Sequence, residues 1–278
     1  MLDMPQVETG YVAVNGGKLY YEVAGAGHPF LLIHAGVADL HMWDDQFPIF
    51  AQRYRVIRYD AREYGRTTTE NITFSNRQDI VDLLNHLGVT QTYVMGCSRG
   101  GQIAIDFTLE HPEMVDALIV VAGGISGYEQ IMTPEVMARV DPAEAALFAQ
   151  MEAAFESKDY PTLIDAEMQM WIDGPNQPPT RVDPRMRAKV RAIIENNYAQ
   201  HVNEAPEAQP LDPPAIDRLD EIHVPTLAIV GDLDASGAQV AMDYLAEHVG
   251  GAQKVVIPGT AHLPNMEQPA PFTQLVLN

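Results

Sequence analysis

The sequence is poor in cysteine, in basic residues and in long apolar runs. Its single cysteine, Cys97, excludes an intramolecular disulfide. The 17 lysines and arginines stand against 38 aspartates and glutamates, which gives a formal charge of −21. This balance argues against nucleic acid and anionic membranes as partners. The longest apolar runs, such as residues 117–122, span five or six residues, whereas a membrane-spanning helix needs about 18.

The beginning of the chain has neither the basic stretch nor the apolar stretch of a secretory signal. We therefore expect a cytoplasmic location. The 278 residues, of which 46% are apolar, suffice for a large buried core. This length fits one α/β domain with an insertion, or one large domain with a small one.

Short apolar runs alternate with helix-length amphipathic segments along most of the chain. A hairpin is expected first, with strands at 11–14 and 18–23 around Asn15-Gly16-Gly17. Six further strands are expected at 30–33, 54–59, 92–95, 117–121, 226–230 and 254–257. Helices are expected at 42–52, 77–87, 100–110, 238–248 and 271–277. The alternation predicts a mostly parallel, eight-stranded α/β sheet covered by helices on both faces.

The interval from about 127 to 222 breaks this alternation. It shows no convincing strand, but helical patches at 134–140, 143–157, 160–171 and 186–201. Because it is too long for a structureless loop, we interpret residues 127–222 as a helical cap. Residues 1–126 and 223–278 would then form the core domain. The alternative is a set of ordinary edge helices with no role as a lid.

The segment Gly96-Cys97-Ser98-Arg99-Gly100 has the pattern G-x-S-x-G between an expected strand and an expected helix. That context is typical of a nucleophile elbow, in which a sharp turn exposes the serine hydroxyl. Glycines on both sides let neighbouring backbone approach closely. We therefore predict that Ser98 is a nucleophile, and that Cys97 is a small buried residue.

A serine hydroxyl needs a base to become a good nucleophile, and histidine is the usual one. Of the nine histidines, His262 lies in a loop directly after a late strand. In a parallel sheet such loops open at the carboxyl edge, beside the elbow. We predict His262 as the base.

The acid that orients the histidine is expected in the segment Gly231-Asp232-Leu233-Asp234, which follows a strand. This gives the chain order Ser, Asp, His that is expected for such a site. Asp234 is the favoured residue, because it lies farther past the strand. Asp232 is the alternative and would otherwise brace the turn.

Two backbone amides should hold the oxyanion that forms during acyl transfer. One would be the amide of Arg99, which follows the nucleophile. The other is expected in the loop after strand 30–33, from Gly36 or else from Val37. The alternative is that these residues only shape a turn.

Together these motifs resemble the α/β-hydrolase fold family across essentially the whole chain. His34-Ala35-Gly36 is similar to its His-Gly-x loop, and this resemblance also implies Gly36 as an oxyanion donor. Segment 60–67 is similar to its D-x-R-G-x-G-x-S segment, with glutamate at 63 and threonine at 67 as departures. In the family the acid is usually the second aspartate of a G-x-x-D turn, which supports Asp234.

Segments 39–44 and 262–269 further resemble 3-oxoadipate enol-lactonases. Arg99 departs from that pattern, because those enzymes usually carry an apolar residue there. Its side chain would either hold a substrate carboxylate or form a salt bridge to the cap.

Two groups of cap residues allow a functional and a structural interpretation. Apolar side chains that could line an acyl pocket, or form the cap's own core, are Phe148, Phe155, Met168, Met170 and Trp171. Arginines that could steer an anion, or form a solvated face, are Arg181, Arg185, Arg187 and Arg191.

The sequence thus predicts a serine hydrolase of a small carboxylic ester or lactone, acting through Ser98, His262 and Asp234. This chemistry requires neither a metal nor an organic cofactor, and no residue set has metal-ligand spacing. One alternative is a C–C bond hydrolase of a vinylogous diketone with the same triad. Another is a ligand receptor or interaction protein without turnover. The oligomeric state is not predicted.

Overall fold

The computed structural model describes residues 6–131, 133, 140–201 and 206–278. Its main sheet has the strand order β1-β2-β4-β3-β7-β8-β10-β11. The strands are β1 (Val7–Val14), β2 (Gly17–Ala24), β3 (His28–Ile33), β4 (Tyr54–Tyr59), β7 (Thr92–Cys97), β8 (Val115–Val121), β10 (Thr226–Gly231) and β11 (Gln253–Ile257). A two-residue strand, β5 (Thr68–Thr69), pairs with β2 at the side. This mostly parallel α/β sheet confirms the predicted fold class.

The antiparallel part of the sheet is confined to its leading edge. β1 and β2 form the expected hairpin, in which Val14 pairs with Gly17. Gly16 in the turn has a φ of +62°, a conformation that suits glycine. β2 runs antiparallel to β4, and each pair from β4 to β11 along the sheet is parallel.

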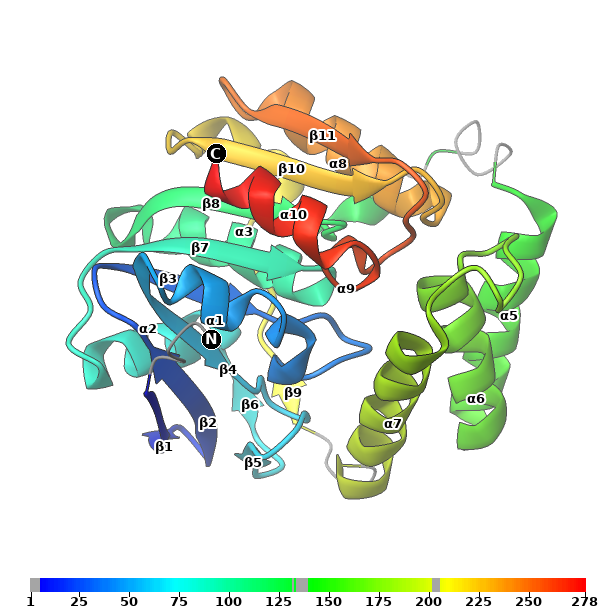
Figure 1. Cartoon of the computed structure of the whole chain (residues 1–278), viewed down its shortest axis with the longest axis horizontal. Helices are drawn as coiled ribbons and strands as arrows, with labels where there is room; N and C mark the ends of the chain where they lie inside the picture. The colour runs from blue at the N-terminus through cyan, green and yellow to red at the C-terminus, as the bar shows by residue number, and fades with distance from the viewer. Residues whose placement is uncertain (1–5, 132, 134–139, 202–205) are drawn as a thin grey trace.

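Helices cover both faces of this sheet (Figure 1). They include α2 (Asn76–His86), α3 (Arg99–Glu110), α8 (Ser236–His248), α9 (Pro264–Glu267) and α10 (Pro269–Leu277). The prediction of one helix over 42–52 is wrong. That stretch holds the end of a 3₁₀ turn, η1 (Leu40–Trp43), and a four-residue helix, α1 (Phe47–Phe50). Pro48 lies in the first turn of α1, where no amide hydrogen is needed, whereas inside a continuous helix it could not donate to the carbonyl of Asp44.

A helical insert lies between β8 and β10. It contains α5 (Pro142–Glu156), α6 (Tyr160–Glu167), a π-helical turn η4 (Met168–Asp173) and α7 (Pro184–His201). Residues 134–139 of the first expected cap helix lie outside the described residues. The expectation of no strand in this interval is wrong at β9 (Glu207–Ala208), which pairs with β6 (Thr73–Phe74). Two residues are too short to produce a detectable pattern.

In Figure 1, α5, α6 and α7 stand beyond the end of the sheet toward which the arrows of β7 and β10 point. The carboxyl ends of the parallel strands therefore face the insert. In parallel α/β sheets this is the edge where binding and catalytic residues collect.

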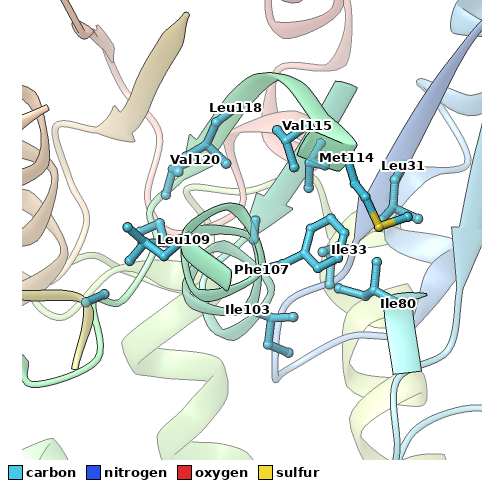
Figure 2. Close-up of a cluster of buried hydrophobic side chains, with 14 of the residues drawn as sticks. Leu31, Ile33, Ile80, Ile103, Phe107, Leu109, Met114, Val115, Leu118 and Val120 are labelled. Atoms are coloured by element: carbon cyan, nitrogen blue, oxygen red, sulfur yellow. The ribbon is translucent and has the colours of Figure 1, made fainter. Parts of the chain in front are cut away.

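Alternate residues of the strands enter two separate cores, one on each face of the sheet. Leu31 and Ile33 belong to one core, and Phe30 and Leu32 to the other. Figure 2 shows the first core, where Phe107 of α3 lies among side chains from the neighbouring strands and helices. This two-sided burial explains the continuous apolar runs of the strands, and it fixes α3 against the sheet.

Candidate active site

Ser98 occupies a sharp turn between β7 and α3. Its φ of +54° and ψ of −119° lie in a region that residues other than glycine rarely adopt. Its own amide donates to the carbonyl of Val121 at 2.8 Å, which ties the turn to β8. A Cβ atom on Gly100 would lie 2.5 Å from the carbonyl oxygens of Ile33 and His34. The flanking glycine is therefore a steric requirement of the turn.

His262 and Asp234 form a buried pair next to this turn. His262 follows β11, Asp234 follows β10, and these strands are neighbours in the sheet. The Nδ1 atom of His262 lies 3.0 Å from both carboxylate oxygens of Asp234. Exposed Asp232 is turned elsewhere, and its Oδ1 accepts from the amide of Gly259 at 2.6 Å. The structure thus pairs Asp234, not Asp232, with His262.

Ser98 and His262 line the same small cavity, of about 180 Å³. Within the described residues, no hydrogen bond joins them directly. The Trp171 ring lies over the His262 ring with a centroid distance of 4.6 Å, and Phe148 packs against Trp171 at 5.8 Å. The rest of the cavity wall is mostly small or apolar: Ala122, Gly123, Gly124, Tyr128, Ala235, Gly237, Ala238 and Ala241.

The predicted acyl-pocket residues of the cap lie in three different environments. Trp171 and Phe148 line the cavity at Ser98, whereas Met168 and Met170 are fully buried, and Met168 belongs to the same hydrophobic core as Phe30 and Leu32. Phe155 is 64% exposed and lines a different cavity. Tyr128 and the residues after Asp234 were not predicted from the sequence as part of the cavity wall at Ser98. The available signal was their position just after the carboxyl ends of β8 and β10.

The loop after β3 is held by His34. Its Nε2 accepts from the Ala61 amide at 2.9 Å, so Nδ1 carries the proton and donates to the carbonyl of Ala35 at 2.8 Å. Burial is the main cause that lowers the pKa of His34 to about 4, so the ring is neutral near pH 7. This arrangement orients the loop that carries Gly36.

Gly36 lies against the residue after the nucleophile. A Cβ atom on Gly36 would be 3.7 Å from Cβ of Arg99. Among the described residues, the amides of Gly36, Val37 and Arg99 donate to no protein acceptor. Amides without a protein acceptor are what an oxyanion site needs, so Gly36 and Val37 both remain candidates for the second donor.

The side chain of Arg99 is half-buried, and its guanidinium lies over the Tyr64 ring, 5.0 Å from the centroid. In the described part of the chain it forms no ion pair, so of the two alternatives the salt bridge to the cap is not seen there. Its Nη1 atom is buried and has no hydrogen-bond partner.

In the segment 60–67, Glu63 stands where the family pattern has a glycine, and it adopts a backbone conformation typical of glycine. Glu63 has a φ of +71°, in the left-handed region. Gly65, with a φ of +52°, approaches the Asp60 carboxylate so closely that a Cβ would lie 2.2 Å from Oδ2. Asp60 accepts from the amides of Arg66 and Leu40.

Three of the four cap arginines form ion pairs. Arg181 contacts Glu267, Arg187 binds Asp173 at 2.8 Å, and Arg191 contacts Asp165. These ion pairs neutralise the charges of Arg181, Arg187 and Arg191.

Cys97 is buried, and its thiol faces the backbone carbonyl of His262 at 3.7 Å. Burial raises the pKa of the thiol well above its ordinary value, so it stays protonated. Across the described ranges, no three His, Cys, Asp or Glu side chains are grouped to hold a metal ion. None of the helices in these ranges combines the length and apolar character that crossing a bilayer requires.

Comparison with known proteins places these features in a family. Residues 28–269 match the alpha/beta hydrolase fold family. The chain belongs to this family, as its strand order and its strand–Ser98–helix turn indicated.

Two relatives match over most of their length, and a third over less than half of its own. RutD of Azorhizobium caulinodans is 28% identical over 279 residues, which cover 96% of each chain. The 3-oxoadipate enol-lactonase 1 of Acinetobacter baylyi is 24% identical over 85% of this chain and 82% of its own. A soluble epoxide hydrolase of a Corynebacterium species is 29% identical, but only over 39% of each chain.

Solved structures agree with this fold. Est816, described as an N-acyl homoserine lactone degrading enzyme, has a TM-score of 0.74 at 24% identity and covers 96% of this chain and 99% of its own. The protein is therefore a hydrolase-family chain with the fold that its motifs predicted.

Proposed function

We propose that this protein is a serine hydrolase that cleaves a small carboxylic ester or lactone through an acyl-enzyme intermediate. The observation that carries the proposal is the convergence of three residues. The strained turn presents Ser98 to a cavity whose wall also contains His262, and Asp234 holds the far side of that imidazole. A relative named as a 3-oxoadipate enol-lactonase and a solved structure described as an N-acyl homoserine lactone degrading enzyme support the substrate class.

The proton transfers follow from which ring nitrogen of His262 is already hydrogen-bonded. Because Nδ1 of His262 faces Asp234, Nε2 is left to take the proton of the Ser98 hydroxyl. The serine oxygen then bonds to the carbonyl carbon, and the amides of Arg99 and Gly36 hold the oxyanion. As the ester C–O bond breaks, His262 returns the proton to the leaving oxygen. Water, activated by the same histidine, then releases the acid and restores Ser98.

The cavity limits the size of the group held beside Ser98. A volume of about 180 Å³ with apolar walls accommodates a short acyl chain or a small lactone ring. Its aromatic part, Trp171 and Phe148, also shields the His262 imidazole from water.

The test is hydrolysis of p-nitrophenyl acetate, butyrate and octanoate and of an enol-lactone by wild type and Ser98→Ala. We expect wild type to prefer the short esters or the lactone, and the variant to lose at least about a thousandfold in kcat. Ser157→Ala is the matched control, because its hydroxyl only caps the end of α5 through the carbonyls of Ala153 and Ala154. A fluorophosphonate should label wild type at Ser98.

Other outcomes would replace the proposal. Turnover of a vinylogous diketone without ester or lactone turnover would make the protein a C–C bond hydrolase. If wild type neither turns over any substrate nor reacts with the fluorophosphonate, the fold serves as a receptor. Equal rates for wild type and Ser98→Ala would remove the serine from the mechanism.

A further inference from the structure

A second, larger cavity of about 490 Å³ adjoins the oxyanion loop. Gly36 forms part of its wall, together with residues of the 63–64 turn and of α5, α6 and α7. The cavity therefore lies between the core and the helical insert, on the Gly36 side of Ser98. A substrate whose carbonyl sits at Gly36 and Arg99 would extend its other end into this space.

The walls of this second cavity are rich in aromatic rings. Tyr64, Phe155, Tyr160 and Tyr198 all line it. The rings of Tyr160 and Tyr198 are 5.2 Å apart and inclined by 35°. Within the described residues, no lysine or arginine lies over either of these two rings. Aromatic faces carry negative electrostatic potential and attract cations, most effectively where water is excluded.

Glu167 adds a carboxyl group that is only half satisfied. Its Oε1 accepts from the Tyr198 hydroxyl at 2.8 Å. Its Oε2 is buried and has no hydrogen-bond partner, and no ion pair to Glu167 occurs in the described part of the chain. By contrast, the buried carboxylates of Glu22 and Asp79 each have an arginine, and those of Asp60 and Asp106 accept hydrogen bonds from amides or a hydroxyl. Burial raises the pKa of Glu167 to about 7, because its charged form lacks a counterion.

We propose that the second cavity binds an organic cation, so that the preferred substrate is an ester with an alkylammonium group in its alcohol or acyl part. This inference rests on the proposed ester hydrolysis for its link to catalysis, but the cation site itself does not. The ammonium would lie among the tyrosine rings with Glu167 as its counterion. The formal charge of −21 would also draw cationic molecules toward the protein.

The charged groups that line the cavity are mostly carboxylates. Glu63, Glu156 and Glu167 line it, against Lys158 and the imidazole of His201. Glu156 and Lys158 are exposed at its rim, where water screens their charges. The Arg99 guanidinium lies over Tyr64, and it is the feature that would favour an anionic substrate instead.

Three esters of matched shape distinguish these possibilities. Acetylcholine carries the cation, 3,3-dimethylbutyl acetate is its neutral isostere, and 4-acetoxybutanoate carries a carboxylate. In wild type at pH 8 we expect kcat/KM for acetylcholine to exceed that for the neutral isostere about tenfold. In Glu167→Gln this ratio should fall to about one to threefold. In Glu195→Gln, an exposed change on α7 with the same loss of charge, the ratio should stay as in wild type.

The pH dependence of the ratio tests whether the charge of Glu167 contacts the ammonium group. A purely structural role of Glu167 would not make the ratio depend on pH. Glu167 loses its proton as the pH rises through about 7, so the wild-type ratio should rise from pH 6 to pH 8. Any pH effect on the catalytic steps that the two esters share cancels in the ratio. The imidazole of His201 and the tyrosine hydroxyls remain in Glu167→Gln, where we expect a flat ratio. A slope that persists in this variant would overturn the assignment to Glu167.

Calorimetry separates this inference from the proposed function. Benzyltrimethylammonium should bind to Ser98→Ala, which cannot react, and bind at least about fivefold more weakly when Glu167→Gln is added. If wild type hydrolyses none of the esters but this binding is seen, the hydrolase proposal fails and the cation site stands. A preference for 4-acetoxybutanoate, or no binding of the cation, would overturn the site.

Discussion

Arg181 of the helical insert forms a buried ion pair with Glu267, and the other oxygen of Glu267 holds the loop of His262. That oxygen, Oε1, accepts from the amide of Ala261 at 2.8 Å. Arg181 also donates to the carbonyl of Gly259 at 2.9 Å in the same loop. The insert is thereby joined to the loop that carries the predicted base.

We expect Arg181→Met to lower both stability and activity. It would leave the Glu267 carboxylate buried without its cation, which typically costs about 3–5 kcal/mol. The loop of His262 would also lose a direct tie, so kcat should fall about tenfold or more, since small displacements of catalytic groups are costly. Urea unfolding and p-nitrophenyl acetate kinetics measure the two effects. Arg185→Met, in the same insert but with no side-chain ion pair among the described residues, is the control. Wild-type stability of Arg181→Met would contradict this role.

Substitution of the two aspartates near His262 should separate their roles. Asp234→Asn should lower kcat by about four orders of magnitude, as the equivalent change does in serine protease triads, because the amide no longer stabilises the imidazolium. Asp232→Asn keeps an oxygen that can accept from the Gly259 amide, so its kcat should stay within about threefold of wild type. Equal losses in both variants would argue against Asp234 as the acid.

The elbow should tolerate no side chain at position 100. In Gly100→Ala the new Cβ would meet two backbone oxygens at 2.5 Å, and neither can move without shifting β3 or its loop. We expect a loss of at least about 3 kcal/mol in stability, or an inactive enzyme. Gly250→Ala is the control, since nothing lies within 4 Å of its Cβ position. Thermal unfolding that shows both variants equally stable would contradict the steric argument.

The stability of the protein should depend on pH through Glu167. Its pKa rises from 4.5 in an exposed chain to about 7 in the fold. Between these values the folded protein keeps a proton that the unfolded chain has lost, so this group's contribution to stability falls as the pH rises from about 5 to 7. Glu167→Gln removes this dependence and should gain about 1–3 kcal/mol relative to wild type between pH 5 and pH 8.

Urea unfolding at the two pH values gives this difference directly. The exposed substitution Glu195→Gln should show the same difference from wild type at pH 5 and pH 8. A Glu167→Gln difference that is also independent of pH would show that the Glu167 carboxyl is ionised in the fold throughout this range.

Much of the fold could be predicted from the sequence, because its signals are local. The strands at 30–33, 117–121 and 226–230 were visible as mostly apolar runs, since a parallel sheet buries both faces. The predicted helix at 42–52 failed where Pro48 interrupts it. The pattern G-x-S-x-G predicted the turn at Ser98, because a side chain at either glycine would clash with nearby backbone atoms.

The partners of these residues were decided by the tertiary structure. Asp232 and Asp234 are two residues apart, and the sequence only favoured one of them. The Arg181–Glu267 pair, the unpartnered oxygen of Glu167 and the Tyr160–Tyr198 pair depend on how the insert packs on the core. Local patterns determined the elements and the nucleophile. Contacts between distant segments decided the cavities, because side-chain distances across the fold are not encoded in any short stretch of sequence.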